Sequence, residues 1–145
     1  MSEEVIDFFV EYAKEAFIYF GNKVRYWITM NEPAVVAEAG YMYEFHPPLH
    51  FDFEEVVKVH HNQVIAHLKV VKIFHELKVK GKIRKDAKIG IVLNVRPVIP
   101  RSSRTADVIA AKVADLFFHR IYLDPIYLHS YPNDMKNVLK YANIK

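Results

Sequence analysis

The sequence predicts an α/β fold built from consecutive strand–helix units, and two observations carry that prediction. Residues 24–30 and 88–95 are short apolar runs that have the length of buried strands. Longer segments with apolar residues three and four positions apart flank and separate these runs. Because strands that alternate with helices pair through right-handed crossovers, we expect both strands to lie parallel in one sheet.

The chain of 145 residues is long enough for one domain with a core and too short for two, so residues 1–145 are expected to form a single domain. With 52% hydrophobic residues and only 4 glycines, it is expected to be globular. The absence of cysteine excludes disulfides and thiolate metal sites, and a cytoplasmic location is the expectation. The acidic N-terminus predicts neither a signal peptide nor a membrane span.

The first helix is predicted from a possible N-cap at Ser2 to its end at Gly21. Its apolar stripe consists of Ile6, Phe9, Val10, Ala13, Phe17 and Phe20. The run from Val24 to Met30 is rich in aromatic and β-branched residues, as buried strands are, and Pro33 ends it.

The segment from Ala34 to Phe51 loses this periodicity and is predicted to be a long loop. Asp52 and Glu55 then have the spacing of a capping box, which predicts a second helix through about Lys78.

The second strand, Lys88 to Val95, is almost uniformly apolar, which is typical of a strand covered on both faces. A third helix is predicted over about Ala106 to Arg120, and Leu123-Asp124-Pro125 follows it. A terminal helix is predicted near Asn133 to Tyr141.

The candidate catalytic residue is Glu32, which follows the strand Tyr-Trp-Ile-Thr-Met within the run Asn31-Glu32-Pro33. Enzymes with parallel sheets place catalytic carboxylates at the carboxyl ends of strands, where a rigid element meets a loop open to solvent. The second strand likewise ends on a polar residue, Asn94.

An ordered set of motifs resembles the sequences of family 1 glycoside hydrolases, the β-glucosidase and β-galactosidase family. The set comprises Trp27-x-Thr29-x-Asn31-Glu32-Pro33, Gly40-Tyr41, His61-Asn62 with His67, Ile89-Gly90-Ile91 running to Asn94, and Ala114-Asp115 leading to Arg120 and Asp124-Pro125. The resemblance implies an internal segment of a (β/α)8 TIM barrel, roughly from the third helix through the fifth strand and the following helix.

The resemblance also implies roles for particular residues. Glu32 would be the general acid/base, and Asn31 would hydrogen-bond the sugar 2-hydroxyl. Asn31 and Asn94 are the candidate substrate-binding residues, and the substrate would be a β-glycoside or oligosaccharide. No cofactor is implied.

The family nucleophile is a glutamate in a Thr/Ser-Glu-Asn-Gly context, and the 145 residues contain no such motif. We therefore expect the isolated chain to be inactive unless a complementing polypeptide or a homo-oligomer completes the site. As substitute nucleophiles, Glu38 and Glu44 are disfavoured as loop residues, and Asp52 and Glu55 because they serve a helix N-terminus.

The sequence departs from the family pattern at three positions. Glu44 and Leu49 replace residues that are usually glycine, and His119 replaces an asparagine. Glycine is often required where φ is positive. The backbone geometry of the loop after the first strand can therefore differ from that of the family.

Other readings carry less weight. The lysine-rich segment 78–88 is read as a solvated surface and not as a nucleic-acid site, because no aromatic residues are interleaved. The histidines do not show the spacing of a metal site, and Trp27 is interpreted as a core residue in preference to a sugar-stacking residue.

The alternative to a glycosidase segment is a non-catalytic relic or self-associating interaction module with at most weak sugar binding. Exposed sheet edges favour a homo-oligomer.

Overall fold

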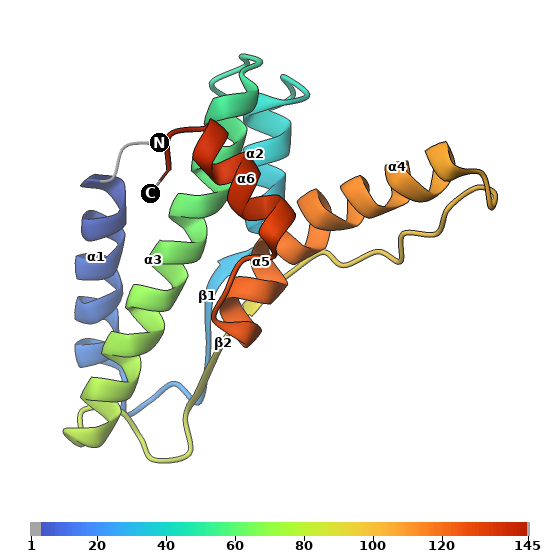
Figure 1. Ribbon diagram of the computed structural model, residues 1–145. Helices are drawn as coiled ribbons and strands as arrows, with labels where there is room; N and C mark the ends of the chain where they lie inside the picture. Colours follow the sequence, from blue (N-terminus) through green and yellow to red (C-terminus); the bar gives the residue numbers. More distant parts are fainter. Residues whose placement is uncertain (1–3, 145) are drawn as a thin grey trace.

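The structure is a computed structural model that describes residues 4–144, so the predicted cap at Ser2 lies outside the described residues. Two strands and a series of helices follow one another along the chain (Figure 1). The elements are α1 (Glu4–Phe20), β1 (Tyr26–Asn31), α2 (Pro33–Tyr41), α3 (Phe53–Val79), β2 (Lys88–Val92), α4 (Thr105–Asp115), the π-helical turn η1 (Leu116–Arg120), α5 (Ile121–Leu123), the π-helical turn η2 (Asp124–Leu128) and α6 (Asn133–Tyr141).

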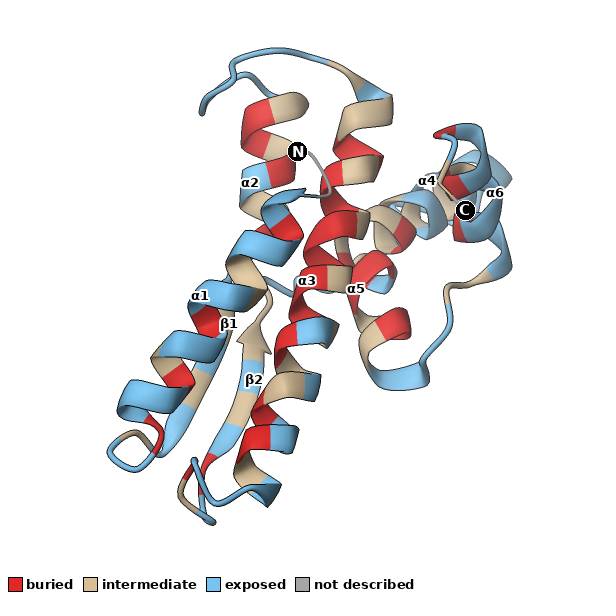
Figure 2. Ribbon diagram, turned by 90° about the vertical axis from the view of Figure 1, so that its left-hand side faces the viewer, coloured by how far each residue is buried: buried red, intermediate tan, exposed pale blue. Residues whose placement is uncertain are grey.

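The strands β1 and β2 pair in parallel, which confirms the expected topology. Tyr26 lies opposite Lys88 and Asn31 opposite Val92, with an irregularity in the register between Ile28 and Asn31. The helix α3 connects the two strands and packs on both of them and on α1. Figure 2 shows buried residues along the inner side of α3 and exposed residues on its outer side.

The core consists of two clusters on the two halves of α3. One cluster joins α1 to the C-terminal half of α3, where the Phe17 ring makes edge contacts with the rings of Trp27 and Phe74 at centroid distances of 4.8 and 5.3 Å. Trp27 therefore packs against core residues, in agreement with the sequence-based interpretation. The other cluster joins the N-terminal half of α3 to the C-terminal helices through Val57, Val64, Leu116, Ile121, Tyr122, Met135 and Leu139.

The helix α2 corrects the prediction that residues 34–51 form one loop. Pro33 follows the end of the strand and is also the first residue of this helix, where the missing N–H has no cost. The helix has nine residues and buries Ala37, Ala39 and Gly40. A β-carbon at Gly40 would lie 2.9 Å from the Pro47 carbonyl oxygen, so this close approach of the following loop requires glycine.

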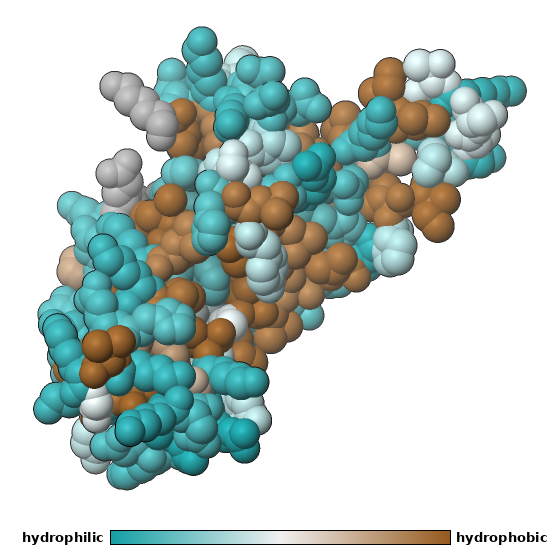
Figure 3. Space-filling view, turned by 60° about the horizontal axis from the view of Figure 1, so that its bottom comes forward, coloured by the Kyte–Doolittle hydropathy of each residue, from teal (hydrophilic) through white to brown (hydrophobic). Residues whose placement is uncertain are grey.

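The expectation that the second strand is covered on both faces is wrong for residues 4–144. Lys88 and Gly90 of β2 are exposed, and Tyr26 and Ile28 of β1 are 63% and 60% exposed. The reason is that α1 and α3 cover one face of the sheet, and no described residue buries the other. Figure 3 shows apolar side chains gathered across the middle of one face of the molecule.

The predicted third helix, about Ala106 to Arg120, is longer than expected, because helical elements continue without interruption to Leu128. It runs from α4 through η1 and α5 into η2, and Pro125 is buried near the start of η2, where a residue without N–H is tolerated. No residue of α4 is buried, and α4 projects from the body beside the loop that precedes it (Figure 1). The terminal helix α6 has the predicted bounds.

Candidate active site at the carboxyl ends of the two strands

Glu32 lies directly after β1 and has an unusual backbone conformation. Its φ of 45° and ψ of 58° place it in the left-handed region, which costs a non-glycine residue about 1–2 kcal/mol. Backbone hydrogen bonds hold it on both sides: its N–H donates to the Val92 carbonyl of β2 at 2.9 Å, and its own carbonyl accepts the N–H of Val35 at 2.9 Å. Strain that is held in place in this way is often found at functional sites.

The Glu32 side chain is available for chemistry. It is half-buried, and within residues 4–144 it neither caps a helix nor forms an ion pair. The backbone therefore fixes the position of the Glu32 side chain, and within residues 4–144 its carboxylate forms no ion pair or helix cap.

The structure brings Asn31, Glu32 and Asn94 to the same end of the sheet. Asn31 is the residue of β1 opposite Val92, and Asn94 follows Val92 by two positions on the neighbouring strand. Both asparagines are exposed. A half-buried carboxylate and two exposed amide side chains at the same end of the sheet are groups that can hydrogen-bond to the hydroxyl groups of a sugar.

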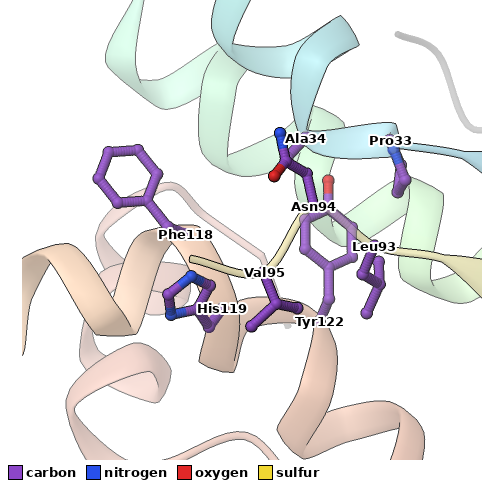
Figure 4. Close-up of a pocket in the computed structure, with 8 residues that line it drawn as sticks. All are labelled: Pro33, Ala34, Leu93, Asn94, Val95, Phe118, His119 and Tyr122. Carbon is purple, nitrogen blue, oxygen red and sulfur yellow. The ribbon is translucent and has the colours of Figure 1, made fainter. Parts of the chain in front are cut away.

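A small hollow lies next to Asn94, between the start of α2 and the η1–α5 segment (Figure 4). It is lined by Pro33, Ala34, Leu93, Asn94, Val95, Phe118, His119 and Tyr122. Its volume of about 10 Å³ approaches that of one water molecule and is far too small for a sugar ring. These residues therefore support the strand ends and do not enclose a substrate.

Two buried histidines of α3 connect it to its neighbours. The Thr29 hydroxyl lies 3.2 Å from the Gly90 carbonyl, to which it donates, and 2.8 Å from Nδ1 of His67. The Tyr122 hydroxyl donates to Oε1 of Gln63 at 2.7 Å and lies 2.6 Å from Nδ1 of His60. Each hydroxyl has a single proton and donates it elsewhere, so both Nδ1 atoms carry hydrogen and donate.

Burial determines the ionisation of these groups. It lowers the pKa of His60 to about 3 and also lowers that of His67, because an apolar environment disfavours the charged imidazole. Burial raises the pKa of the Tyr122 hydroxyl well above its usual range. The cluster of His60, Gln63 and Tyr122 is therefore neutral and joins α3 to α5. The sequence analysis missed it because its members are distant in sequence.

The other carboxylates weighed as nucleophiles have different positions. The Asp52 carboxylate accepts the Glu55 N–H at 3.0 Å and caps α3, and the Glu55 carboxylate lies 3.4 Å from Nδ1 of His50. Both therefore serve the start of the helix, as predicted. Glu38 is a half-buried residue of α2 and not of a loop; burial raises its pKa, and the charge of Arg96 partly offsets that effect.

The three departures from the family pattern have structural counterparts. Glu44 and Leu49 have φ values of 54° and 61°, so both positions where the family has glycine adopt the left-handed conformation. His129, with φ 55°, is a further such position, which the sequence analysis did not identify. His119 is buried and bonded through both ring nitrogens.

Residues 4–144 contain no cluster of three histidine, aspartate or glutamate side chains that could hold a metal ion. Three histidines of α3, His60, His61 and His67, lie within hydrogen-bonding distance of hydroxyl groups; His61 lies 3.1 Å from the Tyr131 hydroxyl. Within the same residues, no helix combines the length and the apolar character that crossing a bilayer requires.

The comparison with protein families shows to which family the chain belongs. The profile described as Glycosyl hydrolase family 1 matches residues 1–145. The chain belongs to glycosyl hydrolase family 1. The position of Glu32 at the end of β1 is thus a position within a family 1 sequence, and the resemblance stated from the motifs is confirmed.

Individual relatives agree with this assignment. The 6-phospho-β-glucosidase GmuD of Bacillus subtilis is 39% identical over 141 residues, which are 97% of this chain and 29% of that protein. A solved β-glucosidase from Exiguobacterium marinum matches with a TM-score of 0.84 and 34% identity over 97% of this chain and 31% of its own. The β-glucosidase from Thermotoga maritima in complex with deoxynojirimycin gives a TM-score of 0.81 and 36% identity, with coverage of 98% and 30%.

The chain thus spans about 30% of the length of these family 1 relatives. The solved neighbours are TIM-barrel glycoside hydrolases, and the two parallel strands with their helices form a partial α/β segment of such a barrel.

Proposed function

We propose that this chain carries the acid/base half of a family 1 β-glycosidase site, with Glu32 as the general acid/base. The observation that carries the proposal is the left-handed Glu32 at the end of β1: its backbone is bonded to Val92 of β2, and its side chain neither caps a helix nor forms an ion pair within residues 4–144. In this proposal β1 and β2 correspond to the fourth and fifth strands of the barrel, so that Glu32 faces the mouth where substrates bind.

The chemistry assigns Glu32 two successive steps. In retaining hydrolysis, a protonated carboxyl gives its proton to the leaving oxygen while a second carboxylate attacks the anomeric carbon. The same group, now ionised, then takes a proton from the water that hydrolyses the glycosyl–enzyme intermediate. Asn31 binds the sugar 2-hydroxyl next to the reacting carbon, and Asn94 binds from the end of β2. The substrate class is β-glycosides.

The nucleophile must come from outside the residues that the sequence provides. Retaining enzymes place the two carboxyl groups about 5 to 5.5 Å apart. The 145 residues lack the nucleophile motif, and Asp52 and Glu55 are engaged at the start of α3. In this proposal the remaining strands of the barrel supply the attacking carboxylate, and the 145 residues alone do not hydrolyse glycosides.

A chimeric enzyme tests this proposal. Residues 1–145 replace the matching segment of the Thermotoga maritima β-glucosidase, and the release of nitrophenol from an aryl β-glucoside is measured. We expect Glu32→Gln to lower the rate by about 10²- to 10⁴-fold. Glu44→Gln, which changes an exposed carboxylate beyond α2, is the matched control and leaves the rate within about twofold. A Glu32→Gln chimera as fast as its parent contradicts the acid/base role.

A second function, self-association, is favoured by the open face of the sheet. Tyr26 and Ile28 are exposed there, and within residues 4–144 each strand pairs on one edge only. Unpaired edges beside apolar side chains promote association. We therefore infer that the isolated chain forms a homo-oligomer. Light scattering at micromolar concentration tests this, and a monodisperse monomer contradicts it.

A further inference from the structure

The His119 imidazole connects two segments near the candidate site. Its ring is buried, with 5% of the residue exposed. Nε2 accepts the backbone N–H of Arg96 at 3.0 Å, and Nδ1 lies 2.8 Å from the Asp115 carboxylate. A carboxylate only accepts, so the ring proton is on Nδ1 and the lone pair is on Nε2. Both contacts are therefore satisfied by a neutral imidazole in one tautomer.

Arg96 is the anchored point of the loop that follows β2. It lies two residues after Asn94, and its guanidinium is 5.8 Å from the centre of the Phe118 ring, next to His119 in sequence. The η1 turn thus holds Arg96 by its backbone through His119 and by its side chain through Phe118. Because Asn94 lies between this anchor and the end of β2, its position depends on both.

We propose that His119 is a positioning residue that holds the Asn94 segment in place only while its imidazole is neutral. A second ring proton would turn Nε2 into a donor facing the donor N–H of Arg96, and two donors cannot bond. The Asp115 contact would survive, since Nδ1 still donates. The loop, and not the helical turn, would therefore be released. The consequence for sugar binding rests on the proposed role of Asn94; the release itself does not.

Charged and titratable groups face His119 from each neighbouring element. Arg120, the next residue of the chain, interacts with the Asp115 charge. Asp115 faces it from the end of α4, and Arg96 faces it from the loop. The Glu38 carboxyl of α2 interacts with the Arg96 charge, and the Tyr122 hydroxyl of α5 lines the same hollow. None of these groups replaces Nε2 as the acceptor for the Arg96 N–H.

Nuclear magnetic resonance on the 145-residue chain tests the proposal without substrate. The His119 ring signal and the Arg96 amide are followed from about pH 8 to about pH 5, the range in which histidines commonly gain a proton. We expect both to change with one midpoint, and the hydrogen-exchange protection factor of the Arg96 amide to fall about tenfold across it, as the loss of one hydrogen bond predicts. An Arg96 amide that stays constant while the His119 ring titrates overturns the proposal.

Two variants separate this cause from others. In His119→Gln, the side-chain oxygen replaces Nε2 as an acceptor that does not titrate, so the pH response of Arg96 should disappear. In His129→Gln, an exposed histidine just after the end of η2 is removed, and the response should remain. A response that persists in His119→Gln overturns the proposal. If that variant does not fold, the natural chain still tests the proposal, because the pH midpoints of the His119 ring signal and the Arg96 amide can be compared in it. Failure of the glycosidase proposal would show in the chimera and leave these measurements unchanged.

Discussion

The Thr29 hydroxyl lies 2.8 Å from Nδ1 of His67 and 3.2 Å from the Gly90 carbonyl, so a single side chain joins β1 to both α3 and β2. Thr29 is three residues before Glu32. The contact therefore holds the strand that positions the candidate catalytic carboxylate against the helix behind it.

Thr29→Val should destabilise the chain by about 1–3 kcal/mol, because valine has nearly the same shape and leaves the buried His67 N–H without an acceptor. Thr29→Ser keeps the hydroxyl and should therefore reduce the free energy of unfolding by clearly less than Thr29→Val. Urea unfolding at neutral pH measures both. A Thr29→Val chain as stable as the natural one would show that this contact does not hold the strand.

The buried His60 should make the chain sensitive to acid. Its pKa is lowered from 6.5 to about 3 on folding, so the unfolded chain takes up a proton that the folded chain does not. Above pH 6.5 the neutral His60 costs no stability. As the pH falls from 6.5 toward 3, the free energy of unfolding decreases progressively, and the loss at pH 5 is about 2 kcal/mol.

Urea unfolding at pH 7 and pH 5 checks this expectation. His60→Asn keeps a donor near the Tyr122 hydroxyl and does not titrate. The decrease in its free energy of unfolding between pH 7 and pH 5 should therefore be smaller than that of the natural chain by about 2 kcal/mol. His75→Asn changes an exposed histidine of the same helix and should behave like the natural chain. Equal acid losses in all three chains would contradict the assignment.

Leu49→Gly should stabilise the chain by about 0.5–1 kcal/mol. Leu49 has a φ of 61° and is 56% exposed, so glycine relieves a strained backbone at little cost in buried area. Leu49→Ala removes the same side chain but keeps the β-carbon, and should give no such gain. Thermal unfolding compares the three chains; a Gly variant no more stable than the Ala variant would argue against backbone strain at this position.

Gly21→Ala should be costly, by about 1–3 kcal/mol or more. A β-carbon there would lie 2.5 Å from the Lys82 carbonyl oxygen and closer still to that of Phe17, and backbone atoms cannot easily move aside. Gly90→Ala is the matched control, since nothing lies within 4 Å of the added carbon. Similar unfolding midpoints for the two variants would refute the close approach at the end of α1.

The sequence could predict those elements whose signals are local. Asp52 caps α3 as its spacing with Glu55 predicts, and the apolar stripe through Phe17 defines α1. The position of Glu32 was predictable for the same reason, because an apolar run that stops at Asn-Glu-Pro is a local signal. α2 was missed because Pro33 ends a strand and begins a helix at once, and the segment after it shows little amphipathic periodicity.

Features that depend on tertiary packing could not be predicted from the sequence. The uniform apolar pattern of β2 does not reveal which of its faces is covered, and Gly90 is exposed. The bond between His119 and Arg96 joins residues 23 positions apart, and only the fold brings them together. The left-handed conformation of Leu49, by contrast, could be anticipated from the glycine that family members have there.

The central claim is that Glu32 gives a proton to the leaving group, and the dependence of the rate on that leaving group tests it most directly. In the chimera, kcat/KM reports the first chemical step, in which the proton is needed. For an alkyl β-glucoside, whose leaving group departs poorly without a proton, Glu32→Gln should lower kcat/KM by about 10²- to 10⁴-fold. For a dinitrophenyl β-glucoside, whose leaving group departs readily as an anion, the loss should be less than about tenfold. Equal losses for both substrates would contradict the acid/base assignment of Glu32.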